Sequence, residues 1–296
     1  WMDRAYLSAY ESMEIDSNIS MQKPFDAMKF VETTFPITDD DPEENNTYLS
    51  CNWAVGTNLD RELYIAFDIL DYALLSTQGA PVKQALLDAG IGTDIYGGYD
   101  SSSYQPIFSI VAKHANASDQ KRFEQVIRDV LQEQVKNGIN KKTLLAAING
   151  SEFKFREADF GRFPKGLMFG LQVMDSWLYD ADPMLHLQYQ KTFDYLKKAA
   201  QEGYFEQLIK DYLLDNPHEA VVIVSPEIDL TAREDAELAE RLAKYKDSLS
   251  SEQVKALVKE TAELKAYQEE PSTKEDLEKI PMLGREDIKR QSEPFS

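Results

Sequence analysis

Residues 79–113 have the sequence GAPVKQALLDAGIGTDIYGGYDSSSYQPIFSIVAK, and this stretch decides the fold class. Pro81 suits the first turn of a helix, where its missing N–H costs nothing, and Gly90 suits the position just beyond a helix end. Apolar residues recur between them at helical spacing, namely Val82, Ala85, Leu86 and Ala89. The first part of the stretch therefore predicts a short helix.

Two strands are predicted to follow this helix. Apolar positions alternate with polar or glycine positions over residues 91–99, which is typical of a strand. After a polar turn at residues 100–103, a second alternating segment places Phe108, Ile110 and Ala112 on one face and Ile107 and Val111 on the other. That segment predicts a strand buried on one face and partly covered on the other. A helix followed by an antiparallel pair indicates an α+β fold.

The glycines of this stretch have a structural explanation. Gly90, Gly92, Gly97 and Gly98 are not followed by the helix that a phosphate-binding loop requires. We expect sheet curvature and close packing to account for them. Replacement of Gly92 or Gly98 by valine is therefore expected to lower the stability of the fold.

The residues before this stretch extend the same pattern. Alternation over residues 49–55 predicts a half-buried strand. Asn58 is expected to cap a following apolar helix that reaches Leu75. The first 35 residues have only a mixed pattern, with some helical character over residues 3–13 and a less regular apolar segment over residues 25–31.

The residues after it predict mainly helices. Ser118 is expected to cap a long helix that ends near residue 135, and several helices are expected over residues 140–213. Residues 221–224 form a fully apolar run that predicts a short strand, closed by Pro226.

The composition changes near residue 229, which predicts a domain boundary there. Residues 232–247 and 251–268 are expected to form two charged helices, the second opened by a capping box over residues 250–253. Their apolar stripe is narrow, as expected for a helical hairpin that docks on another surface. Prolines then predict an extended tail.

The formal net charge of −20 argues against nucleic-acid binding, which needs clustered Lys and Arg. Residues 1–228 hold 20 basic and 35 acidic side chains, a net charge of −15. Such a surface could attract cationic peptides by electrostatic steering, or it could serve only solubility.

Cys51 is the only cysteine, so no intrachain disulfide is possible and a cytoplasmic location is favoured. No apolar run approaches the roughly 20 residues that span a membrane, so no membrane partner is expected. The chain begins Trp1-Met2 without a signal-peptide pattern, which indicates a cut inside a longer polypeptide.

Metal-binding motifs are absent from the sequence. The three histidines are His114, His186 and His218, expected at a strand end, on a helix and just before a strand. None of them starts H-E-x-x-H or the inverted H-x-x-E-H. The acidic loop at residues 39–46 lacks the ligand spacing of a calcium loop and is expected to be solvated.

Other catalytic signatures are also missing. Cys51 lies on the inward face of a predicted strand, so we interpret it as a packed core thiol. A nucleophile elbow, a Walker loop and a G-x-G-x-x-G turn are absent. One segment remains unusual, residues 152–167. It places Arg156 and Glu157 at a helix end, and it is either a peptide-contacting loop or a charge-capped connection between helices.

Several spaced motifs resemble one protein family. They are Asn52-Trp53, Pro81-Val82-x-x-Ala85-Leu86-Leu87-Asp88-x-Gly90-Ile91-Gly92, Gln105-Pro106-x-Phe108-Ser109-Ile110, Glu152-Phe153 to Arg156-Glu157, Gly161, Pro164, Gly166-Leu167, Trp177-x-Tyr179-Asp180-x-Asp182-Pro183, Asn216-Pro217-His218, Gln268-Glu269-x-Pro271 and Ile280-Pro281-x-Leu283. With them the chain resembles the insulinase/pitrilysin-type inverted zinc metalloproteases, and within that group the presequence-protease branch.

The resemblance implies a fold and an arrangement of domains. Such proteases have four related α/β domains in two halves that close around a peptide. The first domain holds zinc through H-x-x-E-H and a distal Glu, and the motif Glu activates the metal-bound water. The second domain shares the fold without the metal, and a helical hairpin joins the halves. This chain matches the second domain and the start of that hairpin.

The resemblance also defines what the chain should and should not contain. Residues 1–22 would be a connector or the end of the preceding domain, residues 23–229 a non-catalytic α+β peptidase domain with an antiparallel sheet packed against helices, and residues 230–296 a helical hairpin linker and extended tail. No catalytic, cofactor-binding or metal-ligating residue is predicted in the chain. Zinc is expected in the missing N-terminal domain of the parent protein.

The expected function is therefore a non-catalytic, chamber-forming fragment of a zinc metalloendopeptidase that degrades oligopeptides or unfolded peptides. Its expected partners are the remaining domains of the same polypeptide and peptide substrates. Two alternatives remain open. The chain could belong to a scaffold subunit of a processing-peptidase-like complex, or it could be a stand-alone peptide-binding module.

Overall fold

The structure is a computed structural model that describes residues 1–11, 13–288 and 291. Its internal contacts divide the chain into two compact units, residues 1–230 and residues 231–296. No helix in the described part of the chain is long and apolar enough to cross a membrane.

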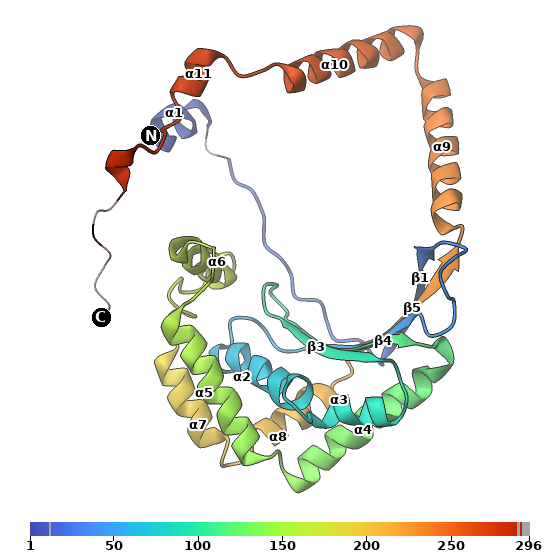
Figure 1. Ribbon diagram of the computed structural model, residues 1–296, viewed down its shortest axis with the longest axis vertical. Helices are drawn as coiled ribbons and strands as arrows, with labels where there is room; N and C mark the ends of the chain where they lie inside the picture. The colour runs from blue at the N-terminus through green and yellow to red at the C-terminus, as the bar shows by residue number, and fades with distance from the viewer. Residues whose placement is uncertain (12, 289–290, 292–296) are drawn as a thin grey trace. The chain divides into compact units, whose positions relative to one another are not determined.

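The first unit is built on one mixed sheet (Figure 1). Within the described residues the sheet has five strands in the order β1-β5-β2-β4-β3. Neighbouring strands are antiparallel except β1 and β5, which pair in parallel. The strands are β1 Lys29–Ile37, β2 Thr47–Ala54, β3 Asp94–Asp100, β4 Ile107–Ala115 and β5 Glu219–Ile228.

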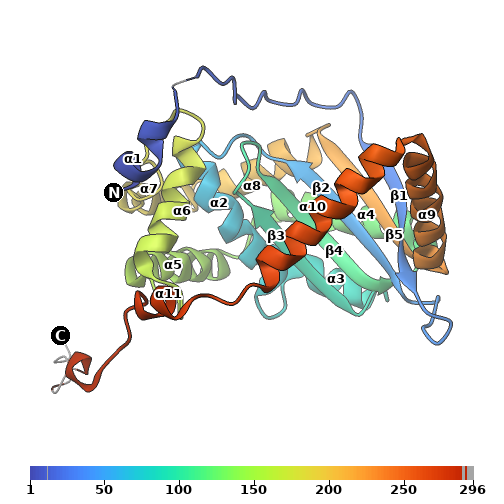
Figure 2. The same ribbon diagram turned by 90° about the horizontal axis from the view of Figure 1, so that it is seen from above.

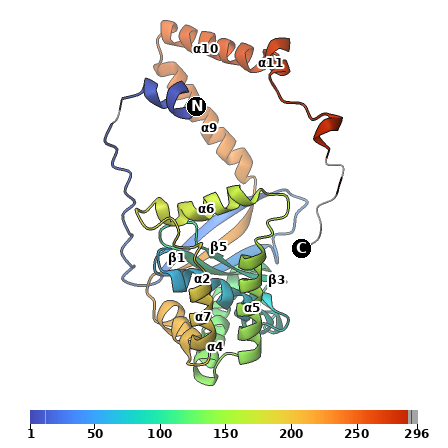
Figure 3. The same cartoon turned by 90° about the vertical axis from the view of Figure 1, so that its left-hand side faces the viewer.

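Helices cover one face of this sheet. In Figure 1, α2, α3, α4 and α8 lie beneath the strands, and α5 and α7 pack beside α2. Helix α6 lies apart from this layer, on the other side of the sheet (Figure 3). The helices of the first unit are α1 Met2–Ala5, α2 Arg61–Asp71, α3 Pro81–Asp88, α4 Gln120–Asn137, α5 Lys141–Glu157, α6 Lys165–Trp177, α7 Gln190–Ala199 and α8 Tyr204–Ile209. The α+β fold predicted from the sequence is confirmed.

The core lies between the sheet and the helices. On β2, Cys51 pairs with Ile110 of β4 on one side and with Val221 of β5 on the other, and all three side chains are buried. Phe67 of α2 packs against Phe108 of β4, with ring centroids 5.6 Å apart. The inward positions that sequence alternation predicted for β2 and β4 are the buried ones, because a strand with one covered face alternates between core and surface.

Two strands differ from the sequence prediction. β1 was missed because its residues carry no alternation: both faces are largely exposed in this chain, and Phe30 is 47% exposed. β5 does not stop at Pro226 but continues to Ile228. Proline is tolerated there because β2 pairs with β5 only as far as Val224, so the missing N–H breaks no bond to β2.

Several element ends also differ. Asp60, not Asn58, caps α2, and its carboxylate accepts from the Leu63 N–H. A capping box of Asn116 and Asp119 precedes α4 in place of a cap by Ser118. The strand β3 starts at Asp94 rather than residue 91.

The open face of the sheet holds an extended N-terminal segment, residues 20–28, which leads into β1 (Figure 2). The Gln105 side chain accepts from the backbone N–H of Gln22 (2.6 Å) and donates to its carbonyl (3.1 Å). The Phe25 ring packs edge-on against His218, with centroids 4.6 Å apart. One amide side chain thus pairs with the main chain of this segment as a neighbouring strand would.

We expect Gln105→Glu to loosen this segment. A carboxylate cannot donate to the Gln22 carbonyl, and the loss of one hydrogen bond costs about 1 kcal/mol. Trypsin cleavage after Lys23 should then be about fivefold faster, because cleavage follows the open population. Gln78→Glu, which makes the same charge change at an exposed site, is the control. Equal cleavage rates for the two variants would contradict the pairing.

The second unit consists of charged helices. α9 Leu230–Ser248 starts at the last residue of the first unit, and α10 Ser251–Glu269 follows with the predicted capping box of Ser250 and Gln253. The tail predicted as extended contains a short helix, α11 Lys274–Glu278, capped by Thr273. Residues 289–290 and 292–296, which complete the predicted linker, lie outside the described residues.

Candidate functional site

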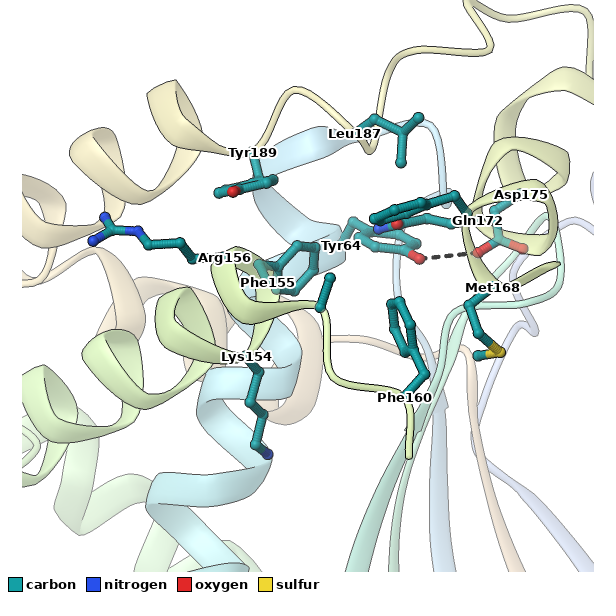
Figure 4. A pocket seen from close by; sticks show the side chains of 12 residues that line it. Tyr64, Lys154, Phe155, Arg156, Phe160, Met168, Gln172, Asp175, Leu187 and Tyr189 are labelled. Atoms are coloured by element: carbon teal, nitrogen blue, oxygen red, sulfur yellow. Dashed lines mark hydrogen bonds between the residues drawn. The ribbon is translucent and has the colours of Figure 1, made fainter. Parts of the chain in front are cut away.

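A cavity of about 580 Å³ lies where α5, α6 and the segment leading into α7 meet α2 (Figure 4). This volume falls in the range of about 300–1,000 Å³ that small-ligand sites occupy. Its lining is mainly aromatic and aliphatic. The lining residues are Tyr64, Lys154, Phe155, Arg156, Ala158, Phe160, Met168, Phe169, Gln172, Asp175, Leu187 and Tyr189.

The segment that forms one wall is the one that stood out in the sequence, residues 152–167. Helix α5 ends at Glu157 because Ala158 takes the left-handed conformation (φ 48°). The Asp159 carboxylate then accepts from the Gly161 N–H (2.9 Å), which tightens the turn into α6. This reversal directs Phe155 and Phe160 towards the same space, as Figure 4 shows.

The polar end of the cavity is a hydrogen-bonded pair. Tyr64 Oη donates to Asp175 Oδ2 at 2.9 Å, drawn as the dashed line in Figure 4. Burial raises the pKa of the Asp175 carboxyl, although the hydrogen bond from Tyr64 opposes this shift. Burial also raises the pKa of the Tyr64 phenol, and the Asp175 charge adds to that shift. The pair presents an oxygen-rich end to an otherwise apolar space.

Helix α6 is held in place by buried polar contacts at its end. Asn58 is fully buried, and its Nδ2 donates to the Asp175 carbonyl oxygen at 2.7 Å. Ser176 Oγ donates to the Asp182 carbonyl at 2.9 Å. These contacts explain why Asn58 is not free to cap α2. They also fix the position of Asp175 in the cavity.

The cations of this segment do not point into the cavity. Arg156 pairs with Glu152 one helical turn away (3.0 Å), and Lys197 of α7 binds the same carboxylate (2.5 Å). Figure 4 shows Arg156 and Lys154 directed away from the cavity. The Glu157 carbonyl accepts from Lys165 Nζ at 3.1 Å, which joins the two helices. The segment is therefore a charge-bridged helix connection whose aromatic residues line a cavity.

The three histidines occupy different environments. His114 ends β4, where its Nδ1 lies 2.9 Å from Thr93 Oγ1. His218 packs against Phe25, as described above. His186 lies in the turns between α6 and α7, not on a helix as the sequence suggested, and its ring stacks on Tyr64 at 3.8 Å between centroids.

The described residues offer no zinc site. No group of three or more His, Cys, Asp or Glu side chains among residues 1–11, 13–288 and 291 could hold a metal ion. The Cys51 thiol is buried, and burial raises its pKa well above the ordinary value, which keeps it in the inert neutral form. The donor set of this chain thus does not fit the metal that the resemblance implies for the parent protein.

Family models match two parts of the chain. The one described as "Peptidase M16 inactive domain" matches residues 7–151, and one described as associated with subfamily C of peptidase M16 matches residues 224–296. The chain belongs to the peptidase M16 family. The resemblance found in the sequence is confirmed.

Relatives of this M16 chain are longer than it is. Protein HypA of Clostridium perfringens is 39% identical over 99% of the chain and 30% of its own length. Presequence protease 1, chloroplastic/mitochondrial, of Arabidopsis thaliana is 30% identical over 97% of the chain and 27% of its own length. A protease from Helicobacter pylori with a solved structure is similar in fold, with a TM-score of 0.56 at 12% identity, over 76% of the chain and 50% of its own. The M16 chain therefore spans about 30% of the length of the curated relatives it matches.

Sequence reasoning missed the polar end of the M16 chain's cavity. Tyr64 lies on α2 and Asp175 on α6, 111 positions apart in sequence, and no local pattern joins them. The available signal was the apolar character of α6 on all sides, which no buried core explains. Trp177 at 60% and Leu171 at 54% exposure confirm that this helix is not a core helix of the first unit.

Proposed function

We propose that the chain is the non-catalytic, chamber-forming part of a zinc metalloendopeptidase that degrades oligopeptides or unfolded peptides. The observation that carries the proposal is that the match to an M16 inactive domain is followed, within one chain, by the match to the domain associated with M16 subfamily C. The relatives, more than three times as long, have room for a catalytic domain and a second half. Zinc would then be held by the N-terminal domain of the parent protein.

The surfaces of the first unit support a role inside a larger polypeptide. The outer face of α6 carries Leu171 and Trp177 in solvent, and the exposed β1 carries Phe30. Apolar side chains clustered on a surface commonly mark interaction sites. We propose that the remaining domains of the same polypeptide cover them, and that the parent protein works in the cytoplasm.

The proposed division of the chain follows from this role. Residues 1–22 would connect to the preceding domain, residues 23–229 would form the chamber wall, and residues 230–296 would begin the helical linker to the second half. In this arrangement the chain confines a peptide and supports the zinc domain without touching the metal.

A second candidate function is a stand-alone peptide-binding module, which the cavity at residues 152–167 favours. A scaffold subunit of a processing-peptidase-like complex is the third. The upstream reading frame separates them: an H-x-x-E-H motif there supports the peptidase, its absence in a long parent supports the scaffold, and the absence of any long parent supports the module.

The test compares the 296-residue chain with the parent polypeptide. The parent should bind one zinc ion per molecule by atomic spectroscopy and cleave an unfolded peptide, and chelation should abolish the cleavage. The chain alone should retain less than a tenth of an equivalent of zinc and cleave nothing. Stoichiometric zinc and peptide cleavage in the chain alone would refute the proposal.

A further inference from the structure

The cavity described above has a use that a structural wall does not require. Its walls are apolar, and Phe155, Phe160 and Met168 point into it from α5, α6 and their connection (Figure 4). The neighbouring cations point away. The ionisable pair left at the cavity is Asp175 with the Tyr64 hydroxyl. A concave apolar space with few convergent polar groups is the usual form of a ligand site.

The electrostatic surroundings favour a positively charged ligand. Tyr99 lies beneath this region, and its phenol pKa is raised first by burial and then by the nearby Tyr64, Asp60 and Asp68. Asp100 adds to the pKa rise of Asp175 itself. With residues 1–228 at a net charge of −15, the field at the cavity mouth attracts cations and repels acidic peptides.

We propose that this cavity binds a bulky apolar side chain of a cationic oligopeptide, with the Asp175 carboxylate taking an adjoining N–H or ammonium group. The proposal rests on the proposed function only in treating that peptide as a substrate of the parent protein. The cavity volume of about 580 Å³ suits one or two large side chains rather than a domain surface. The surface available to another domain is the outer face of α6, where Leu171 and Trp177 lie.

The binding test uses the 296-residue chain and a fluorescein-labelled twelve-residue peptide of Gly, Ser and Lys with one central Phe. Anisotropy should report saturable binding that weakens as salt rises. Replacing the peptide's Phe by Ser should weaken binding by about tenfold or more, because the buried apolar area is lost. Replacing its Lys residues by Glu should abolish binding.

Two matched pairs of variants locate the site. Phe160→Ala should weaken binding about fivefold or more, whereas Phe163→Ala, three residues along the same connection, exposed and outside the cavity lining, should change it less than twofold. Asp175→Asn keeps an oxygen for the Tyr64 hydroxyl and should weaken binding about fivefold. Asp194→Asn, an equal charge change on the exposed side of α7, should have no effect.

A cavity-filling variant guards against unfolding as the cause. Met168→Trp should block the peptide while near-UV circular dichroism and thermal unfolding remain those of the original chain. Equal effects of Phe160→Ala and Phe163→Ala would overturn the proposal, as would peptide binding that survives Met168→Trp. Loss of binding when the rest of the parent polypeptide is added would assign the cavity to domain packing and also overturn it.

The two proposals can fail separately. If the parent cleaves peptides but the chain binds none, the cavity is not a subsite and the chamber role stands. If the chain binds the cationic peptide through Phe160 and Asp175 but the parent has neither zinc nor peptidase activity, the site stands and the chamber role fails.

Discussion

Replacement of Gly92 by valine is expected to lower the free energy of unfolding by about 3–5 kcal/mol, the largest effect of any change in the β3–β4 region. Gly92 has φ +68°, a backbone conformation that a β-branched residue rarely adopts. A Cβ atom there would also lie 2.5 Å from the Lys113 carbonyl oxygen. That oxygen accepts from the Thr93 N–H at 3.0 Å, so it cannot move without breaking the join between the strands.

Urea unfolding followed by far-UV circular dichroism measures this effect. Gly98→Val is the matched control, because a Cβ at Gly98 meets nothing within 4 Å and its φ is not positive. We expect that variant to stay within about 1 kcal/mol of the original chain. The sequence prediction that Gly98 is equally sensitive is therefore revised. Equal destabilisation by the two valines would show that strand propensity, not the backbone approach, controls stability here.

The close packing expected from the glycines does occur, one position earlier. A Cβ at Gly97 would collide with the Asp71 carboxylate and the Leu75 side chain at the end of α2. Gly97 thus lets the helix lie directly on the edge strand β3. Sequence alone could not separate Gly97 from Gly98, because neighbouring strand positions face opposite sides and the covered side depends on where α2 packs.

The second large effect expected is a loss of stability of about 3 kcal/mol at most between pH 6.5 and pH 4, caused by His186. This ring is only 3% exposed, and neither ring nitrogen makes a hydrogen bond within the described residues. Burial, with the nearby Arg61 charge, lowers its pKa from 6.5 to about 4. The unfolded chain therefore takes up a proton near pH 6.5, and the folded chain only near pH 4.

The sign follows from that difference. Between pH 6.5 and pH 4 the unfolded state binds more protons than the folded state, so stability is full above pH 6.5 and falls as the pH drops. The buried carboxyls Asp68, Asp71 and Asp175 act oppositely in the lower part of this window, because burial raises their pKa values. The contribution of His186 must therefore be taken as a difference between variants.

The measurement is urea unfolding at about pH 7.5 and about pH 4.5 for the original chain and for His186→Phe, which keeps an aromatic ring on Tyr64. The stability of the variant should fall less with pH, by about 2 kcal/mol or more. His114→Asn is the control, since His114 is exposed and Asn tolerates its positive φ of 57°. A pH dependence unchanged by His186→Phe would show that the ring is protonated without cost.

Patterns of period two and of 3.6 residues predicted the elements whose surroundings lie within the chain. The inward residues of β2 and β4 and the helix α3 follow those patterns because their partners are in the same core. Strand β1 and helix α6 escaped or misled pattern analysis because their apolar side chains lie exposed in this chain. Periodicity reports burial, and a surface left open by the chain carries no periodic record of its cover.

The candidate site was half visible in the same way. Residues 152–167 stood out because aromatic and charged residues crowd a turn, but Arg156 and Glu157, the residues suggested for peptide contact, turn out to bridge helices. The cavity's polar end required Tyr64 and Asp175 to meet across the fold. A contact between distant segments depends on packing angles that no single segment encodes.

By itself, the sequence determined the fold class, the family and the want of a zinc-binding motif in this chain, because periodicity and short spaced motifs are local properties of a polypeptide. Only the tertiary structure decided which glycine is pressed against a helix, that Asn58 anchors α6 instead of capping α2, and that Phe160, Asp175 and Tyr64 enclose one cavity. Those facts depend on distances between segments far apart in the chain, and such distances are set only when the whole core packs.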